Sequence, residues 1–414
     1  MKNLFLFTLS YPYIGGGEKS FLQHELKYLI KSFNTLIIPL KIDGTKDKTN
    51  GVALVEEGLY KYLIQISRQR IIYQIFNVLF RGSFYFELFK KPELFYQPRK
   101  VYWLIKSYNK ALHIYKWLFH YIEENNLWTE QIVFYTYWFN EATTAASLIS
   151  KNRSNYRVLT RAHGIDLYEE LYWNYLPLRR LTLSFVDSVC LVSNHAYNYL
   201  SNKYPKYKNK YYIYGLGTIK PSNLASKSTD NILRIVSCSG LIPIKRVDLI
   251  LSGLSYFAKT YKHNIQWHHI GDGPLKNNIQ ERINHLDTNN LKCTLLGDLD
   301  NEVVLNYYKW NPVDVFITTT MTEGGRPVSI QEAQSFGIPT VATRVGGIPE
   351  IVNKQNGILL SEDPSPIEIS NAIYSLISNP QNFEMMRLKA RQNWEINFNE
   401  KINFPRFVNH LRTL

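Results

Sequence analysis

Cysteine is scarce in this chain of 414 residues, which has only three, Cys190, Cys238 and Cys293. They lie far apart, form no Cys-x-x-Cys pair, and leave one thiol over in any disulfide scheme. This pattern argues against a disulfide framework and a cysteine-rich zinc site. It favours a reducing compartment.

Long apolar runs are also lacking. The longest charge-free apolar stretch, Ile71 to Phe80, has about half of the roughly 20 residues that a bilayer crossing needs. The apolar residues after Lys2 superficially resemble an export signal, but Pro12 and a glycine run follow them without a small-residue cleavage site. We therefore expect a buried first strand, and a chain that is soluble or lies on a surface.

Acidic residues are few in the first half of the chain. Residues 1–220 hold 29 Lys and Arg against 16 Asp and Glu, whereas residues 221–414 hold 19 against 18. A basic surface of this kind attracts nucleic acid, anionic lipid or a phosphorylated ligand, and charge alone does not choose among them.

The order of apolar runs and helical patterns predicts an α/β fold. A polar, turn-rich segment after Lys220 predicts a domain boundary, so we expect an N-terminal domain at 1–220 and a C-terminal domain at 221–390. Residues 59–125, rich in aromatics, Lys and Arg, predict an insertion of two or more helices. The expected strands are 4–9, 35–39, 132–135, 157–162, 188–192, 211–214, 233–237, 265–270, 293–296, 313–318 and 340–342.

The most informative segment runs from Thr318 to Pro339, directly after a predicted strand and into a helix, where open α/β sheets bind ligands. Gly324 and Gly325 let a polyol or a phosphate approach the backbone. Glu323 and Glu332 supply carboxylates, which suit sugar hydroxyls because each accepts two hydrogen bonds. A plain loop with a surface glutamate and a helical glutamate remains the alternative interpretation of this segment.

This segment resembles the signature of glycosyltransferase family 4, the retaining GT-B enzymes that use nucleotide sugars. In that family a first glutamate and its loop amides hold the donor hexose, and a second glutamate that opens a helix binds the ribose. Glu323 and Glu332 take those places here, and the loop between them is one residue longer than is usual in the family. The resemblance implies two Rossmann-like parallel-sheet domains that face each other across a cleft.

Other segments match the family in its order along the chain. Gly16 and Gly17 resemble the glycine-rich loop near the donor phosphate and the acceptor, although a lone glycine run is more often a plain turn. His163 stands in a His-Gly-x-Asp element and would contact the sugar near the reacting carbon, although a solitary histidine is usually structural. Residues 391–414 resemble the closing helix that crosses back to the N-terminal domain.

A phosphate-binding element opens the second half. Lys245 matches the family lysine that neutralises the donor diphosphate, whereas Gly240 stands where the family usually has an arginine. We hypothesise that Arg246 or the inserted Arg326 substitutes for it. Two further family segments, residues 270–275 and 345–352, are interpreted as mainly architectural.

No metal or other cofactor is expected. His268 and His269 are adjacent and would point to opposite faces of a strand, which is poor chelate geometry. The family resemblance agrees, because GT-B enzymes generally need no metal for catalysis. A Walker-type phosphate loop and a Ser-His-Asp order are both missing, which argues against ATPase and hydrolase functions.

The basic aromatic insertion at 59–125 suits an anionic membrane surface, with packing against the N-terminal sheet as the alternative. Nucleic acid is not an expected partner, because no binding motif accompanies these residues. We therefore expect a peripheral protein on the cytoplasmic face of the membrane.

The resemblance implies a hexosyltransferase. Its donor is a UDP- or GDP-linked sugar and its acceptor a lipid-linked glycan of surface polysaccharide (capsule or exopolysaccharide) biosynthesis. Two alternatives stay open: a nucleotide-sugar epimerase on the same fold, and a catalytically degenerate homologue that binds glycan or partner enzymes. The acceptor-binding residues and the oligomeric state are not indicated by the sequence.

Overall fold

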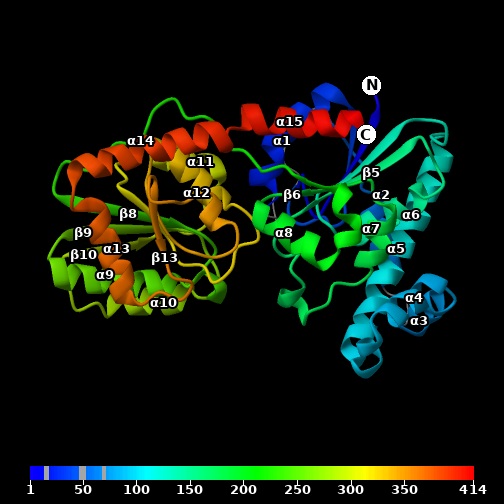
Figure 1. Ribbon diagram of the computed structural model, residues 1–414, viewed down its shortest axis with the longest axis horizontal. Coiled ribbons are helices and arrows are strands. Elements are labelled where there is room, and N and C mark those ends of the chain that lie inside the picture. The colour runs from blue at the N-terminus through cyan, green and yellow to red at the C-terminus, as the bar shows by residue number, and fades with distance from the viewer. Residues whose placement is uncertain (14–17, 46–52, 68–70) are drawn as a thin grey trace. The chain divides into compact units, whose positions relative to one another are not determined.

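The computed structural model describes residues 1–13, 18–45, 53–67 and 71–414. The chain forms two compact units (Figure 1). Unit 1 comprises Met1–Tyr214 together with Phe404–Leu414, and unit 2 comprises Gly215–Asn403. Residues 215–220, which the sequence places in the first domain, therefore belong to unit 2.

Unit 1 is built on a seven-stranded sheet in which neighbouring strands run parallel, in the order β3-β2-β1-β4-β5-β6-β7. Side chains alternate between its faces: Leu4 and Leu6 join one core cluster, whereas Phe5 and Phe7 join another. The strands are β1 (Asn3–Thr8), β2 (Asn34–Pro39), β3 (Leu54–Val55), β4 (Ile132–Thr136), β5 (Tyr156–Ala162), β6 (Ser188–Leu191) and β7 (Tyr211–Ile213).

Helices cover both faces of this sheet (Figure 1). The face of Phe5 is buried by α5, α6, α7 and α8, and the face of Leu4 by α1 and α15. The bounds are α1 (Lys19–Ser32), α5 (Pro98–Glu124), α6 (Glu141–Ser150), α7 (Arg179–Phe185), α8 (Asn194–Lys203) and α15 (Glu400–Thr413), with short helices η2 (Glu169–Tyr172) and η3 (Pro205–Lys210).

The basic aromatic insertion is helical, as its periodicity predicts. It consists of α2 (Gly58–Ser67), α3 (Ile71–Leu79), α4 (Gly82–Lys90), η1 (Pro92–Tyr96) and the long helix α5. Part of it has its own small core, which includes Val78, Phe84, Leu88 and Leu104. Within the described ranges, no helix combines the length and the apolar composition that crossing a membrane requires.

Unit 2 has a six-stranded parallel sheet in the order β10-β9-β8-β11-β12-β13. Its strands are β8 (Ile232–Cys238), β9 (Asn264–Ile270), β10 (Leu291–Leu295), β11 (Val315–Thr318), β12 (Thr340–Thr343) and β13 (Gly357–Leu360). Its helices are η4 (Pro243–Lys245), α9 (Val247–Tyr261), α10 (Lys276–Asn284), α11 (Asn301–Trp310), α12 (Val328–Ser335), η5 (Ile348–Glu350), α13 (Pro366–Ile377) and α14 (Pro380–Asn397).

The C-terminal segment differs from the single helix predicted over 391–414. It contains the end of α14, a break at residues 398–399, and α15. Trp394 on α14 is fully buried in unit 2, where its indole nitrogen donates to Thr218 Oγ1 at 2.7 Å. Phe407 and Leu411 on α15 are instead buried in the core of unit 1.

Candidate functional site

The carboxyl ends of the unit 2 strands carry most of the predicted donor residues. Lys245 follows β8, and Glu323 follows β11, which is its neighbour in the sheet. The Lys245 Nζ lies 3.2 Å from a Glu323 carboxylate oxygen, and both side chains are about a quarter exposed or less. The structure therefore brings together the cation and the carboxylate that the sequence assigns to the diphosphate and the sugar.

Backbone contacts hold these two loops side by side. Met321 N donates to Ile244 O at 2.8 Å, and Thr319 Oγ1 donates to Arg246 O at 2.9 Å. Thr343, at the end of β12, donates its hydroxyl to Thr320 O. The loop that bears Glu323 is thus fixed from both neighbouring strands.

Two glycines after β12 allow the closest of these approaches. Gly346 has a φ of +52°, and a Cβ on it would lie 1.6 Å from the carbonyl oxygen of Glu323. A Cβ on Gly347 would lie 2.4 Å from the carbonyl oxygen of Gly325. The segment 345–352, which the sequence predicts to be mainly architectural, packs directly on the candidate sugar loop.

Glu332 lies on α12 and is 5% exposed. Burial raises the pKa of its carboxyl to about 7, although the Asn301 side chain, which donates to Oε1 at 2.6 Å, opposes the rise. A carboxyl with this pKa is about half ionised at neutral pH, so a ligand that donates hydrogen bonds to it would shift it to the ionised form.

The guanidinium of Arg246 is occupied by contacts with other groups of the protein. Its guanidinium donates to the carbonyl oxygens of Thr319, Thr320 and Glu362 and pairs with Asp363 at 2.8 Å. Its backbone is left-handed, with a φ of +47° just before α9. These partners indicate that Arg246 holds the loop together, so it is a weak substitute for the missing diphosphate arginine.

Arg326 lies on the loop that bears Glu323 and is mostly buried. It lies 4.0 Å from a carboxylate oxygen of Glu350 and over the ring of Phe398. Burial lowers the pKa of its guanidinium, and the Glu350 carboxylate opposes that shift. At Gly240 an added Cβ would meet only one atom within 4 Å, so the site has room for the side chain that this sequence lacks.

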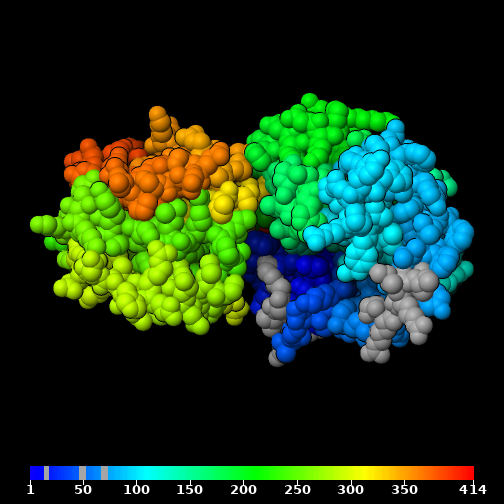
Figure 2. Space-filling view, turned by 90° about the horizontal axis from the view of Figure 1, so that it is seen from below, coloured from blue at the N-terminus to red at the C-terminus, as the bar shows by residue number. Residues whose placement is uncertain are grey.

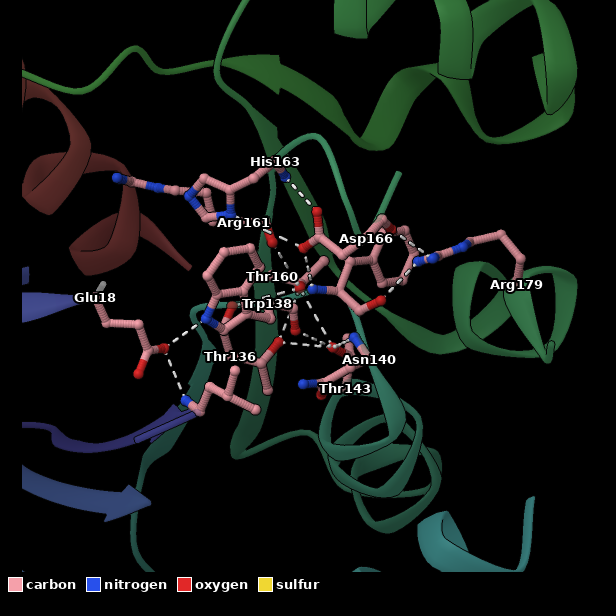
Figure 3. Close-up of polar contacts among 12 residues, drawn as sticks. Glu18, Thr136, Trp138, Asn140, Thr143, Thr160, Arg161, His163, Asp166 and Arg179 are labelled. Atoms are coloured by element: carbon pink, nitrogen blue, oxygen red, sulfur yellow. Dashed lines mark hydrogen bonds and ion pairs between the residues drawn. The ribbon is translucent and has the colours of Figure 1, made fainter. Parts of the chain in front are cut away.

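The remaining predicted residues belong to unit 1. His163 follows β5, and its ring contacts those of Tyr137 and Trp138, with centroid distances of 4.9 and 4.6 Å. Figure 3 shows His163 beside Trp138. Its two ring nitrogens are buried and have no hydrogen-bond partner among the described residues. Gly16 and Gly17 lie outside the described residues.

Metal-binding geometry is not found in the described part of the chain, where no group of three or more His, Cys, Asp or Glu side chains converges. His268 bonds the Tyr307 hydroxyl, and His269 bonds Ser237 and the carbonyl oxygen of Ser239. Burial lowers the pKa of His269 to about 4. Both histidines therefore have structural partners.

Sequence reasoning did not identify two supporting residues. Asn301, the partner of Glu332, has no signal in the sequence because it starts a helix 31 positions away. No sequence motif identifies Trp138 either, although it lies directly after a buried strand, where a parallel sheet presents functional side chains.

Much of unit 2 matches a known protein family. Residues 233–379 fit a family model described as "Glycosyl transferases group 1". Over 182 residues the chain is 29% identical to a phosphatidylinositol N-acetylglucosaminyltransferase subunit of Arabidopsis thaliana, a match that covers 42% of this chain and 38% of that protein. The chain spans less than half the length of this and two other curated relatives, 38% to 45%.

Solved structures match over the full chain. The apo form of the lipopolysaccharide outer core galactosyltransferase WaaB is 12% identical, with a TM-score of 0.70, and covers 100% of this chain and 99% of that one. HepE from Anabaena, solved with UDP and glucose, is 16% identical with a TM-score of 0.63, and each chain is covered completely. At these identities the matches show the fold.

The pKa of Glu332 generates a prediction about pH. The ionised carboxylate accepts hydrogen bonds from a ribose better than the protonated carboxyl, so UDP or GDP affinity should fall about tenfold between pH 8 and pH 6. Titration calorimetry with wild type and Glu332→Gln measures this. The variant should bind more weakly and lose this part of the pH dependence, because the nucleotide's own phosphate titration is common to both proteins. An identical pH profile in the two proteins would exclude Glu332 as the responsible group.

The close approach at Gly346 generates a second prediction. In Gly346→Ala the left-handed backbone costs about 1–2 kcal/mol, and the methyl group would displace the carbonyl of Glu323. We expect the thermal shift produced by UDP or GDP to be lost. The matched control is Gly82→Ala, where nothing lies within 4 Å of the new methyl group and where the nucleotide shift should remain. A wild-type nucleotide response in Gly346→Ala would contradict the prediction.

Proposed function

We propose that the chain is a retaining hexosyltransferase, because residues 233–379 match the glycosyltransferase group 1 family model and the chain has the GT-B fold. It moves a hexose from a UDP- or GDP-linked sugar to a hydroxyl of a lipid-linked glycan in surface polysaccharide biosynthesis, without a metal cofactor.

The observation that carries the proposal is the pairing of Lys245 with Glu323 beside the Gly346 contact. A cation and a carboxylate on neighbouring loops match the two ends of a sugar diphosphate, in which charge lies on the phosphates and hydrogen-bond donors lie on the sugar. Glu332 supplies a second, buried acceptor on the following helix. The solved HepE structure with UDP and glucose supports a ligand of this class.

In the proposed reaction the bond between the sugar C1 and the diphosphate oxygen breaks, and a bond from C1 to the acceptor oxygen forms on the same face. The acceptor's proton moves to an oxygen of the leaving diphosphate. Lys245 stabilises the charge that develops on that diphosphate. Glu323 orients the hexose, Glu332 holds the ribose, and His163 contacts the sugar near the reacting carbon.

A lipid-linked acceptor places the protein at a membrane, and the surface of α3, α4, η1 and the start of α5 fits that location. Figure 2 shows this segment, in light blue to cyan, on the outside of unit 1. It exposes an unusual number of aromatic side chains, here called the aromatic patch: Tyr73, Phe76, Phe80, Tyr85, Phe86, Phe89, Phe95, Tyr96 and Tyr102. Phe80 is 83% exposed and Phe89 is 77% exposed.

Charge on the aromatic patch favours an anionic surface. Its exposed cations are Arg81, Lys90, Arg99 and Lys106, whereas Glu93 is its exposed acid. The Lys90 ammonium lies 5.6 Å from the centre of the Phe86 ring, as in side chains that combine an apolar ring with a charged end at a lipid headgroup. The acceptor of the Arabidopsis relative is a phosphatidylinositol by its name, which supports a lipid acceptor here.

Donor binding is tested by thermal shift with UDP-glucose, UDP-N-acetylglucosamine and GDP-mannose. A ligand at 100 times its dissociation constant adds about 2.7 kcal/mol to the stability of the folded state, which moves the melting temperature by several degrees. We expect one nucleotide to produce this shift in wild type and in a Glu302→Gln control, and to lose it in Glu332→Ala. The anomeric configuration of the product, read by NMR, tests retention.

Three results would redirect the proposal. No shift with any of the three nucleotide sugars would favour a degenerate homologue. Conversion of the nucleotide sugar without an acceptor would favour an epimerase. An inverted product would exclude the retaining mechanism while leaving the donor site intact.

Membrane contact is tested by co-sedimentation with phosphatidylcholine vesicles, with and without phosphatidylglycerol. Replacing both Phe80 and Phe89 by serine should weaken binding at least about tenfold, because each ring contributes on the order of 1 kcal/mol or more at the interface. Arg81→Glu with Lys90→Glu should abolish the preference for phosphatidylglycerol. Trp310→Ser in unit 2, where Trp310 is 73% exposed, is the matched control. Equal binding by all variants would exclude the aromatic patch.

A further inference from the structure

Glu18, at the start of α1, has a buried carboxylate that accepts hydrogen bonds from three consecutive backbone amides. Its oxygens lie 2.7 Å from Leu9 N, 2.6 Å from Ser10 N and 2.9 Å from Tyr11 N, all directly after β1. Glu18 is only 3% exposed. A carboxylate in such a place is an acceptor on both oxygens, and its charge strengthens each bond.

The same carboxylate reaches the neighbouring strand. The indole nitrogen of Trp138, just after β4, donates to Glu18 Oε1 at 2.5 Å (Figure 3). Because this bond fixes one edge of the indole, the ring cannot turn about its side-chain bonds without breaking it. The ring face packs against His163, which follows β5. Glu18 therefore connects the ends of three adjacent strands, β1, β4 and β5.

A second carboxylate fixes the backbone on the other side of His163. Asp166 accepts from His163 N at 2.6 Å and from Phe139 N at 2.8 Å. Arg179 donates to the carbonyl oxygens of Phe139 and Asp166 (Figure 3). The backbone of His163 is thus held by Asp166, whose Oδ2 also lies 3.8 Å from the ring nitrogen Nδ1. The ring nitrogens make no hydrogen bond with the described residues, so the orientation of the ring depends on this contact and on packing.

We propose that Glu18 is a positioning residue that orients the His163 ring through Trp138. The inference rests on the proposed function, in which His163 contacts the sugar near the reacting carbon. Packing and a single 3.8 Å contact with Asp166 leave the imidazole free to tilt, and a reacting centre tolerates little misplacement. The Glu18–Trp138 bond fixes the indole ring, so that the imidazole packs against a surface that is held in place.

The proposal predicts that charge and acceptor number at position 18 matter more than size. In Glu18→Gln the side chain keeps its shape, but it offers one acceptor oxygen, and its NH2 group faces backbone N–H donors. In Trp138→Phe an aromatic ring remains, but the indole N–H is lost together with the five-membered ring that carries it; the control Trp128→Phe has the same loss of ring. Glu18→Gln removes the charge and one of the two acceptor oxygens that hold this network, and Trp138→Phe removes the indole donor.

His163 itself is observed by NMR of protein labelled with ¹³C at the histidine Cε1, and its resonance is assigned by its loss in His163→Asn. Glu18→Gln should move this resonance although Trp138 is unchanged. The matched control is Asp187→Asn, because Asp187 also accepts from a backbone amide, Val158 N at 2.7 Å, but at the start of β5. That control should leave the His163 resonance in place.

Turnover is measured with whichever of UDP-glucose, UDP-N-acetylglucosamine and GDP-mannose gives the largest thermal shift. Trp138→Phe should lower kcat roughly ten- to a hundredfold with the donor KM within about twofold. Trp128→Phe, the same substitution before β4, should leave kcat unchanged. Where Glu18→Gln does not fold, the comparison of Trp138→Phe with Trp128→Phe decides.

A wild-type His163 resonance in folded Glu18→Gln would overturn the proposal, as would equal turnover in Trp138→Phe and Trp128→Phe. The failure of the proposed function has a different signature. If His163→Ala keeps full turnover, the role of His163 in the reaction is wrong, whereas the resonance in Glu18→Gln still reports whether Glu18 orients the ring.

Discussion

The candidate donor site depends on the close approach of two backbone segments, the loop after β11 and the glycine pair after β12. A Cβ at Gly346 would lie 1.6 Å from the carbonyl oxygen of Glu323, so only glycine permits this packing. The left-handed φ of Gly346 has the same cause. Because loops of parallel strands otherwise project freely from the sheet edge, this contact is what makes the position of Glu323 a consequence of the fold.

Once Glu323 is fixed, its charge needs a partner, and Lys245 provides one. A partly buried ion pair contributes little net stability because desolvation offsets most of the attraction. The ion pair matters instead for geometry, because it holds both side chains at the edge of the sheet. In the proposed function a sugar diphosphate would exchange that pair for two new ones, phosphate with Lys245 and sugar hydroxyls with Glu323, so binding would leave no buried charge unpaired. In unit 1 the same principle holds, since Glu18 and Asp166 satisfy backbone amides at the ends of three strands.

Much of this arrangement follows from the sequence. The family model over 233–379 confirms the predicted resemblance, and the solved neighbours confirm the predicted GT-B fold. Every strand expected from an apolar run is present, whereas β3 and β13 were not predicted: β3 has two residues, and the β13 run Gly357–Leu360 is short and follows a polar turn. The side-chain partners could not be predicted, because Asn301 and Trp138 meet Glu332 and Glu18 only through the packing of elements that are distant in the sequence.

The interpretation of Arg246 shows why a motif position does not determine a role. Sequence places Arg246 beside Lys245, so both are expected to face a diphosphate. The backbone at Arg246 is left-handed, and its side chain has different partners from that of Lys245. The guanidinium donates to three carbonyl oxygens and pairs with Asp363. Five donors in a planar fork match such a set of acceptors better than an ammonium would. With Arg326 held beside Glu350 and Gly240 lacking a side chain, the proposed neutralisation of a diphosphate in unit 2 would rest chiefly on Lys245. In the proposed donor site the pair between Lys245 and Glu323 would therefore link phosphate binding to sugar binding, because a ligand that engaged only one of the two residues would leave the charge of the other uncompensated.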